Sequence, residues 1–185
     1  MTCNTPFNRA AMGLAMLAFS ATATQAAQPA ASLRVSSASF SDGGNIPSRF
    51  TCDGPDLSPD LQFSSPPATT RSFAIVTDDP DAPAAFAHWL AYGIPATTLR
   101  LPEGASTSSQ RLAHADEGTN GFGHLGYGGP CPPAGKPHHY IFRVYALDVI
   151  PALQPGASME QVNAALQGHV LAEGRITGLY AREGG

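Results

Sequence analysis

The stretch HYIFRVYAL, residues 139–147, decides the fold class because it combines alternating aromatic and β-branched residues over nine positions. Two shorter runs, FAIVT (73–77) and WLAYGI (89–94), have the same character, and Leu33 and Val35 show the same two-residue spacing. We expect each of these segments to be a strand. Clusters of Gly, Pro, Asn and Asp lie between them and are typical of tight turns. Short strands at this density predict a mainly β protein, a β-sandwich.

One helix is predicted near the end of the chain. Ser158 stands before an apolar-periodic segment and Gln161 follows three residues later, which is the capping-box pattern. The residues that would share one face of this helix are Met159, Val162, Ala165, Leu166 and His169. A last short strand is predicted over residues 175–181. No repeat or linker indicates a second domain, so we expect a single sandwich with a short C-terminal helix.

The first 26 residues have the order of a secretory signal peptide. Residues 1–9 carry one positive charge and no acid, residues 10–19 (AAMGLAMLAF) are apolar, and small residues follow. The apolar run of ten residues is too short to cross a bilayer, which takes about 20 residues. We predict cleavage after Ala26, with Ala23 and Ala27 as competing sites, and a periplasmic or secreted domain of residues 27–185. A buried N-terminal helix is the alternative.

Removal of this segment changes the cysteine count. Cys3 is lost with the leader, and the mature chain keeps Cys52 and Cys131, an even pair in an oxidising compartment. A disulfide between them and two separate thiols both remain open. Two cysteines without CxxC spacing are weak evidence for zinc.

The charge distribution limits the kinds of partner. The chain has 10 Lys and Arg against 14 Asp and Glu, a net charge of −4, and its basic residues are nine arginines and Lys136, without any run. We therefore expect no nucleic-acid interface, because such an interface needs a basic face. The mature sequence has no transmembrane segment and no basic amphipathic helix, so membrane contact would be peripheral. The oligomeric state is not indicated.

The candidate functional residues lie where Pro and Gly interrupt the strands. Asp79 and Asp81 directly follow one predicted strand and are two residues apart, so in extended backbone they share a face. His88 begins the next strand, and His138 and Tyr140, also two apart, begin the long one. If the strand ends are neighbours, these five side chains converge on one site.

The chemistry of this set favours an anion. Imidazole–carboxylate pairs fix a histidine tautomer or favour imidazolium, and the glycine-rich turn at residues 128–135 can expose backbone N–H groups. Two aspartates would repel an anion unless they accept from backbone N–H groups or hold the histidines charged. The alternative is that the aspartates cap a turn and the histidines are satisfied core residues. Metal ligation by Asp79, Asp81, His88 and His138 has no HxH or HExxH spacing to support it, and we expect no metal and no cofactor.

Several separated motifs resemble one protein family. They are DPDAP (79–83), HW (88–89), GYGGPCPP (126–133), KPHHYIFRVYALD (136–148) and FTCDGPDLSP (50–59). Together, and in this order, they are similar to the phosphatidylethanolamine-binding proteins (PEBPs), and in particular to the bacterial Raf kinase inhibitor-like branch of YbhB/YbcL type.

This resemblance implies a Greek-key β-sandwich with a small pocket for phosphate, acetate or a phosphorylated head group. The implied ligand-binding residues are Asp79, Asp81, His88, His138 and Tyr140, with Gly129 and Pro130 on the neighbouring loop. It also implies that His139, where relatives often have Arg, points to the other face of its strand. Phe63 stands where relatives often have Trp, and the Ala82–Pro83 bond corresponds to a cis-proline position.

The sequence therefore predicts an exported binding protein for a small phosphate-bearing or carboxylate ligand. The alternative from another class is a protein inhibitor or regulator that acts through surface loops, with a protease as its partner. Kinase inhibition fits poorly with export. Catalysis, as in a phosphoesterase, has the least support, because there is no GxSxG motif and no serine or cysteine with an identified base, so we assign no catalytic residue.

Overall fold

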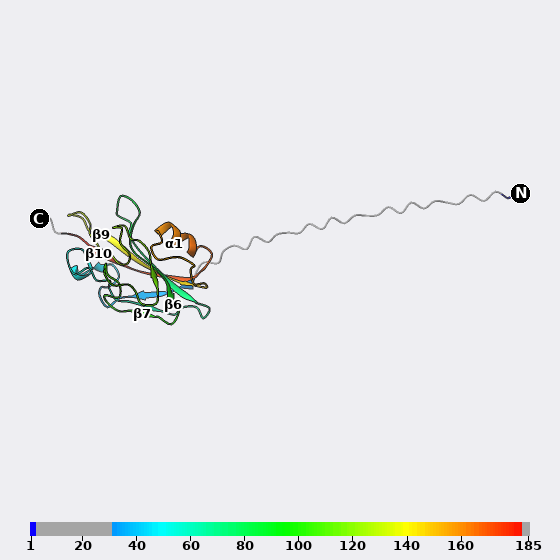
Figure 1. The fold of residues 1–185 in the computed structure, drawn as a ribbon, viewed down its shortest axis with the longest axis horizontal. Helices are drawn as coiled ribbons and strands as arrows, with labels where there is room; N and C mark the ends of the chain where they lie inside the picture. The colour runs from blue at the N-terminus through cyan, green and yellow to red at the C-terminus, as the bar shows by residue number, and fades with distance from the viewer. Residues whose placement is uncertain (3–30, 183–185) are drawn as a thin grey trace.

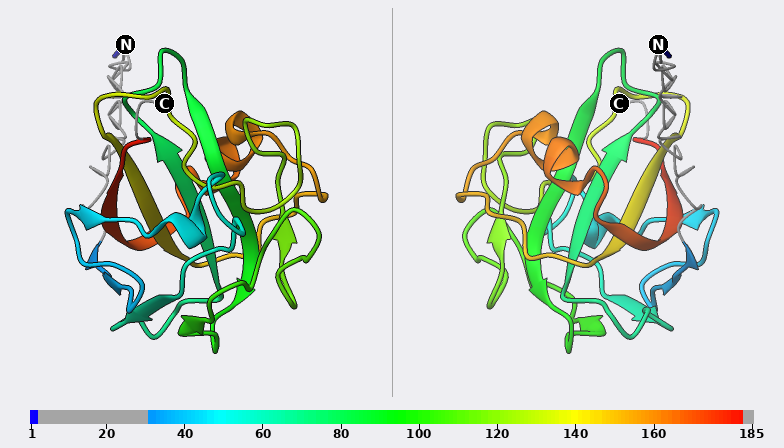
Figure 2. Two further views of the ribbon diagram at one scale, coloured as in Figure 1. Left: turned by 90° about the vertical axis from the view of Figure 1, so that its left-hand side faces the viewer. Right: turned by 90° about the vertical axis from the view of Figure 1, so that its right-hand side faces the viewer.

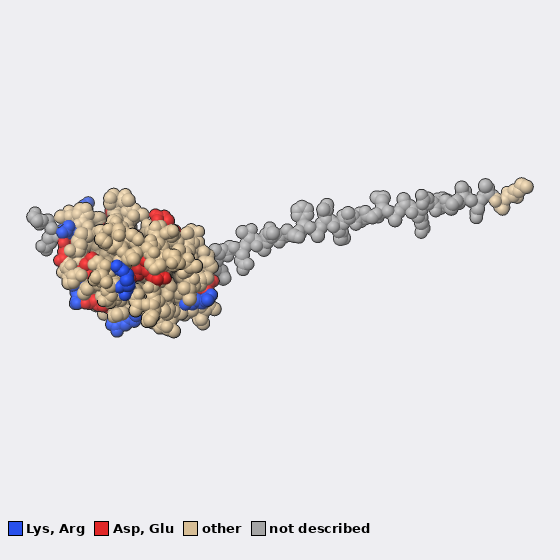
Figure 3. All heavy atoms as spheres, viewed as in Figure 1, with Lys and Arg blue, Asp and Glu red and all other residues tan. Residues whose placement is uncertain are grey.

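The computed structural model describes residues 1–2 and 31–182, and residues 31–182 form one β-rich body (Figures 1 and 2). The predicted signal peptide, apart from its first two residues, and its cleavage site lie outside the described residues. No helix among the residues described is long and apolar enough to cross a membrane. On the face drawn in Figure 3, Lys and Arg are dispersed among Asp and Glu.

The described residues form short and long strands, one 3-10 helix and one α-helix. They are β1 (Ala31–Ser32), β2 (Arg34–Ser36), β3 (Gly44–Asn45), the 3-10 helix η1 (Ser48–Phe50), β4 (Leu61–Ser64), β5 (Ser72–Asp79), β6 (Phe86–Pro95), β7 (Arg100–Leu101), β8 (Asp116–Glu117), β9 (His138–Leu147), α1 (Met159–Leu166) and β10 (Val170–Tyr180). The four long strands are therefore β5, β6, β9 and β10.

These four strands form the centre of the larger sheet, whose order is β1-β10-β9-β5-β6-β8, with β3 paired to β10. Strand β9 pairs antiparallel with β10 on one side and with β5 on the other, and β5 pairs antiparallel with β6. The smaller sheet has the order β2-β4-β7. The end of β5 and the beginnings of β6 and β9 consequently lie at one edge of the larger sheet, which is where the candidate residues were expected.

The main core lies between the two sheets. Inward side chains of the larger sheet, among them Phe73, Trp89 and Phe142, pack with Leu61 and Phe63 of the smaller sheet. The rings of Phe63 and Phe73 lie 5.1 Å apart, so Phe63 fills this wall as an aromatic residue. Burial of such side chains is the main stabilising contribution, about 1.5–3 kcal/mol for each large one.

Helix α1 covers the outer face of the larger sheet (Figure 2). Its Val162 and Leu166 pack with Ala74, Val76 and Leu90 in a second apolar cluster. Strand β5 is therefore buried on both faces, which explains why its sequence is continuously apolar rather than alternating. The predicted capping box is present, since Ser158 Oγ accepts from Gln161 N–H and Gln161 Oε1 accepts from Ser158 N–H.

The end of the helix and the start of the last strand differ most clearly from the prediction. The helix ends at Leu166, so His169 lies beyond it and pairs with Asp148 on the surface instead of completing the helical face. Strand β10 begins at Val170, five residues before the predicted start at residue 175. The sequence did not indicate this earlier start, because Gly174 interrupts the strand pattern. A Cβ atom there would lie 1.9 Å from Leu33 O, so glycine is needed for the close approach of the N-terminal segment.

Candidate functional site

A pocket of about 310 Å³ opens at this edge of the larger sheet. Its lining consists of Asp79, Asp81, Ala82, Pro83, Phe86, His88, Phe122, Cys131, Pro132, Pro133, His138 and Tyr140. The structure thus brings together five of the seven residues that the sequence analysis selected. No lysine or arginine is among these lining residues.

Asp79 organises one wall of the pocket from the last position of β5. Its Oδ1 accepts the backbone N–H groups of Asp81 (2.8 Å) and Ala82 (3.1 Å), which fixes the turn that follows the strand. Its Oδ2 lies 2.7 Å from His138 Nδ1 on β9. Only 6% of the Asp79 side chain is exposed, so all three contacts are made away from bulk water and are correspondingly strong. Asp79 is therefore engaged by the protein itself.

Asp81 forms its hydrogen bonds with His139 instead of His138. Its Oδ2 accepts from both the backbone N–H and the Nδ1–H of His139, each at 2.7 Å. The backbone hydrogen bond from His139, followed by the one from its ring, holds the pKa of the Asp81 carboxyl below its usual range. His139 is exposed and does not line the pocket, in agreement with the alternation along β9. The Asp81–His139 pair instead attaches the turn to the start of β9.

His88 reaches the pocket because β6 has an irregular register. Thr77 pairs with Trp89 and Asp78 with Ala87, so His88 is an extra residue on β6. Ala87 belongs to the outer apolar cluster, whereas Trp89 belongs to the inner one. His88 packs against the inward-facing Tyr140, with ring centroids 5.0 Å apart, so it points to the same side as Trp89. Without this bulge, strict alternation would turn His88 toward the helix.

Burial and hydrogen bonding define the state of His88. The ring is 3% exposed, and its Nδ1 lies 2.7 Å from Gly128 O. Burial lowers the pKa of His88, because the charged form loses its hydration. A carbonyl oxygen only accepts, so Nδ1 carries the hydrogen and the ring is the neutral Nδ1–H tautomer.

Tyr140 forms part of the pocket wall and has an unsatisfied hydroxyl. The residue is 0% exposed, and its Oη has no hydrogen-bond partner among the described residues. Burial raises the pKa of this phenol, and the nearby Asp79 and Asp81 carboxylates raise it further. The neutral hydroxyl is thus a donor that the protein does not use. Buried polar groups are ordinarily paired, so this one requires an explanation.

Two aromatic residues in the lining were missed by the sequence analysis. Phe86 and Phe122 lie 4.8 Å apart edge to face, and each also contacts the ring of His88, at 5.0 and 5.6 Å. Phe122 is 41% exposed. The two-residue spacing of Phe86 and His88 at the start of a predicted strand could have placed Phe86 on this face. Phe122 had no comparable signal, because it comes from a loop.

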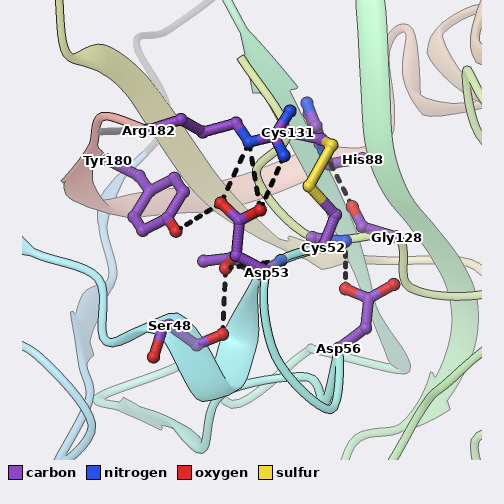
Figure 4. The surroundings of a disulfide bond; sticks show 11 residues. Ser48, Cys52, Asp53, Asp56, His88, Gly128, Cys131, Tyr180 and Arg182 are labelled. Carbon is purple, nitrogen blue, oxygen red and sulfur yellow. Dashed lines mark hydrogen bonds and ion pairs between the residues drawn. A yellow bond between two sulfur atoms is a disulfide. The ribbon is translucent and has the colours of Figure 1, made fainter. Parts of the chain in front are cut away.

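Gly129 and Pro130 do not line the pocket. The Gly129 N–H donates to Asp56 Oδ1 at 2.7 Å (Figure 4). Pro130 O accepts from Cys52 N–H at 3.1 Å. Gly129 instead lines a neighbouring cavity. A Cβ atom on this residue would lie 2.2 Å from Phe50 O, so only glycine fits here. The residues that follow, Cys131 to Pro133, form the pocket wall in their place.

A disulfide fixes this wall. Cys52 and Cys131 are joined across a sequence separation of 79 residues (Figure 4). Next to it, the Asp53 carboxylate accepts from Arg182 Nε and from Tyr180 Oη. The end of β10 and the loop before β9 are thus both attached to the segment around residue 52.

The expectation of a cis-proline is wrong here, because the Ala82–Pro83 bond, like every other bond described, is trans. The turn is held instead by the backbone hydrogen bonds to Asp79. In the described part of the chain, no group of three or more His, Cys, Asp and Glu side chains is arranged to hold a metal ion.

The sequence pattern of the phosphatidylethanolamine-binding protein family matches residues 36–181, a range that includes the whole pocket lining. The chain belongs to the PEBP family. A UPF0098 protein from Methanothermobacter thermautotrophicus is 46% identical over 144 residues, which cover 77% of this chain and 95% of the relative. A UPF0098 protein from Pyrococcus horikoshii is 44% identical over 156 residues, covering 82% and 78%.

Solved structures of PEBP relatives have the same fold. Escherichia coli YbcL, described as a new member of the mammalian PEBP family, is 36% identical with a TM-score of 0.77, over 83% of this chain and 100% of YbcL. A putative PEBP homologue from Chlamydia trachomatis is 34% identical with a TM-score of 0.74, over 82% and 99% of the two chains. The two-sheet architecture with one short helix is therefore a PEBP fold.

Proposed function

We propose that this PEBP-family protein is an exported binding protein whose pocket holds a small anion, either a carboxylate or a phosphate-bearing head group. The observation that carries the proposal is the Tyr140 hydroxyl, which is buried at the pocket wall with no partner among the described residues. A ligand oxygen would supply that partner. His88 and His138 face the same space, and Asp79 is already engaged with backbone N–H groups and His138.

The composition of the lining favours binding over catalysis. It contains no serine or threonine, and its cysteine, Cys131, is bonded to Cys52. Covalent catalysis of the serine, threonine or cysteine type needs such a nucleophile beside a base, and this lining offers none. The apolar residues Phe86, Phe122 and three prolines make most of the remaining wall, as in many small-molecule sites.

Two observations support export. Residues 1–26 have the order of a signal peptide, and Cys52 of the disulfide is exposed. An exposed disulfide is typical of proteins that function in an oxidising compartment, such as the periplasm or the extracellular space.

The test is isothermal titration calorimetry of the mature domain with acetate, phosphate and phosphoethanolamine. We expect saturable binding to the wild type and none to His138→Ala. The matched control is His169→Ala, which removes another Asp-paired histidine on the surface and should leave binding unchanged. Binding that is equal in wild type and His138→Ala would reject this pocket.

A second arm separates the sources of the anion. Co-sedimentation with vesicles containing phosphatidylethanolamine tests a lipid-borne head group, and phosphoethanolamine tests the free one. A folded wild type that binds neither these ligands nor acetate and phosphate would overturn the proposal. The surface loops would then be examined for the inhibitor function.

A further inference from the structure

The pocket is rich in hydrogen-bond acceptors and poor in donors. Its lining has two carboxylates and two imidazoles but no lysine or arginine. Pro83, Pro132 and Pro133 contribute no backbone N–H, and the N–H of Ala82 is already donated to Asp79. An anion needs donors, and among the side chains of the lining only Tyr140 and the two histidines can supply them.

The position of the hydrogen atom on the His88 ring is fixed by two hydrogen bonds that share the Gly128–Gly129 peptide group. His88 Nδ1–H donates to the carbonyl of Gly128, and the N–H of the same peptide bond, on Gly129, donates to Asp56 Oδ1 (Figure 4). Both distances are 2.7 Å. The Asp56 carboxylate polarises this peptide and strengthens its carbonyl as an acceptor, because hydrogen bonds in a chain reinforce one another. Nδ1 thus keeps its hydrogen, and Nε2 of the neutral ring is a bare acceptor.

His138, the second histidine of the lining, also carries its hydrogen on Nδ1. His138 Nδ1 lies 2.7 Å from Asp79 Oδ2, while Asp79 Oδ1 accepts two backbone N–H groups. A carboxylate that accepts on both oxygens leaves the hydrogen on His138 Nδ1. In the neutral ring, Nε2 of His138 is therefore also a bare acceptor. Tyr140 Oη is then the single side-chain donor of the lining that no described residue uses.

The inference drawn from these contacts rests on the proposed function and extends it. We propose that the pocket binds an anion together with one proton, which is taken up from solvent and shared between the ligand oxygen and His138 Nε2. The charges balance, since the free site and an anion of charge −1 combine with H⁺ to give a complex whose charge equals that of the free site. The proton turns one bare nitrogen into the donor that the anion needs.

His138 is the site of the proton because of what faces it. Asp79 lies beside it from the end of β5, Asp81 from the turn after β5, and Tyr140 from its own strand. Because its Nδ1 is committed to Asp79, the Nε2 atom of His138 is the position left for the added proton. His88, from β6, is the other candidate, but its burial lowers its pKa, and Asp56 lies behind the Gly128–Gly129 peptide.

The experiment is calorimetric titration of the mature protein with acetate between pH 7.5 and 9.5, where acetate itself keeps its single charge. Uptake of one proton predicts that the affinity falls about tenfold for each pH unit. Titrations at one pH in two buffers of different ionisation enthalpy should differ in heat by the amount for one proton per acetate.

The outcomes separate the two proposals. Saturable acetate binding with an affinity independent of pH and a heat independent of buffer would overturn proton uptake and leave the anion pocket intact. Absence of binding by acetate, phosphate and phosphoethanolamine alike, at pH 6.5 as well as across this range, would overturn both.

Two variants test the assignment to His138. In His138→Asn, the amide nitrogen stands at the position of the ring Nδ1 and still donates to Asp79, so we expect the fold to persist, with weaker binding and no pH dependence. His169→Asn is the matched control, because His169 Nδ1 pairs with Asp148 at 2.9 Å in the same way but on the surface. It should retain the tenfold change per pH unit. An unchanged pH dependence in His138→Asn would show that the proton resides elsewhere and would refute the assignment.

Discussion

A comparison of two buried tyrosines allows the energetic cost of the unsatisfied Tyr140 hydroxyl to be measured as a difference in stability. Tyr140 and Tyr127 are both nearly inaccessible, at 0% and 1%, and each ring packs edge to face on a neighbouring ring. Tyr127 Oη donates to Phe50 O at 2.8 Å, whereas Tyr140 Oη has no partner among the described residues. Replacement by Phe removes only the hydroxyl and keeps the packing of the ring.

The two substitutions should change stability in opposite directions. Tyr127→Phe leaves the buried Phe50 carbonyl unpaired, which costs about 1–3 kcal/mol. Tyr140→Phe removes a buried hydroxyl whose desolvation has no compensating hydrogen bond, so we expect a gain of about 1 kcal/mol. For a domain of this size, 1 kcal/mol corresponds to about 2–4 °C in Tm. Tyr140→Phe should therefore melt a few degrees above the wild type, and Tyr127→Phe a few degrees below it.

The assay is thermal and urea unfolding in a buffer without phosphate or carboxylate, because a bound anion would stabilise the wild type selectively. Addition of acetate should then raise the Tm of the wild type and of Tyr127→Phe more than that of Tyr140→Phe. The reasoning is refuted if Tyr140→Phe loses as much stability as Tyr127→Phe. That result would mean that the Tyr140 hydroxyl already has a partner of its own in the folded protein.

Two further predictions follow from the disulfide and from His88. In mass spectrometry, the non-reduced mature protein should be two hydrogens lighter than the reduced protein. In urea unfolding, the double variant Cys52→Ser/Cys131→Ser should lose about 4 kcal/mol of unfolding free energy, given the 79-residue separation. Equal stability of variant and wild type would contradict a contribution from this cross-link. The folded-state pKa of His88 is lowered by burial, so its contribution to stability is present above about pH 6.5, the unfolded value, and is lost as pH falls below it. The wild type should therefore lose stability relative to His88→Gln between pH 7.5 and 5.5, by at most about 1.4 kcal/mol per pH unit. Parallel stability curves for the wild type and His88→Gln would rule the effect out.

Local patterns in the sequence predicted the four long strands and most of the pocket for a physical reason, whereas the short strands β3, β4, β7 and β8 were not predicted. The alternation along residues 139–147 reports which side of a strand is buried, and two-residue spacing places His138 and Tyr140 on one face. The same rule, applied to a fixed two-residue period, would place His88 on the wrong face, because the bulge in β6 depends on its pairing with β5. A register irregularity is a property of two strands together, and neither sequence shows it alone.

Contacts made through the backbone were the least accessible from sequence. Asp56 lies 73 residues from Gly129 along the chain, and it influences His88 through a peptide group rather than through a side chain. Residue types carry little information about such a contact, since every peptide offers the same N–H and C=O. The positive φ of Asp56 and the tight space at Gly129 are the structural marks of this contact, and both become visible only in three dimensions.

The sequence alone raised an objection to an anion pocket, because two aspartates beside an anion should repel it. The structure answers this objection through the partners of the two carboxylates. Asp79 is committed to backbone N–H groups and to His138, and Asp81 is committed to His139, so neither needs a cation from the ligand. No lysine or arginine lines the pocket, so in the proposed mechanism the positive charge for the anion comes from a proton on a histidine. A site that works in this way would gain affinity for an anion when it gains a proton, which is why the pH dependence of binding tests the proposal more directly than the affinity at a single pH.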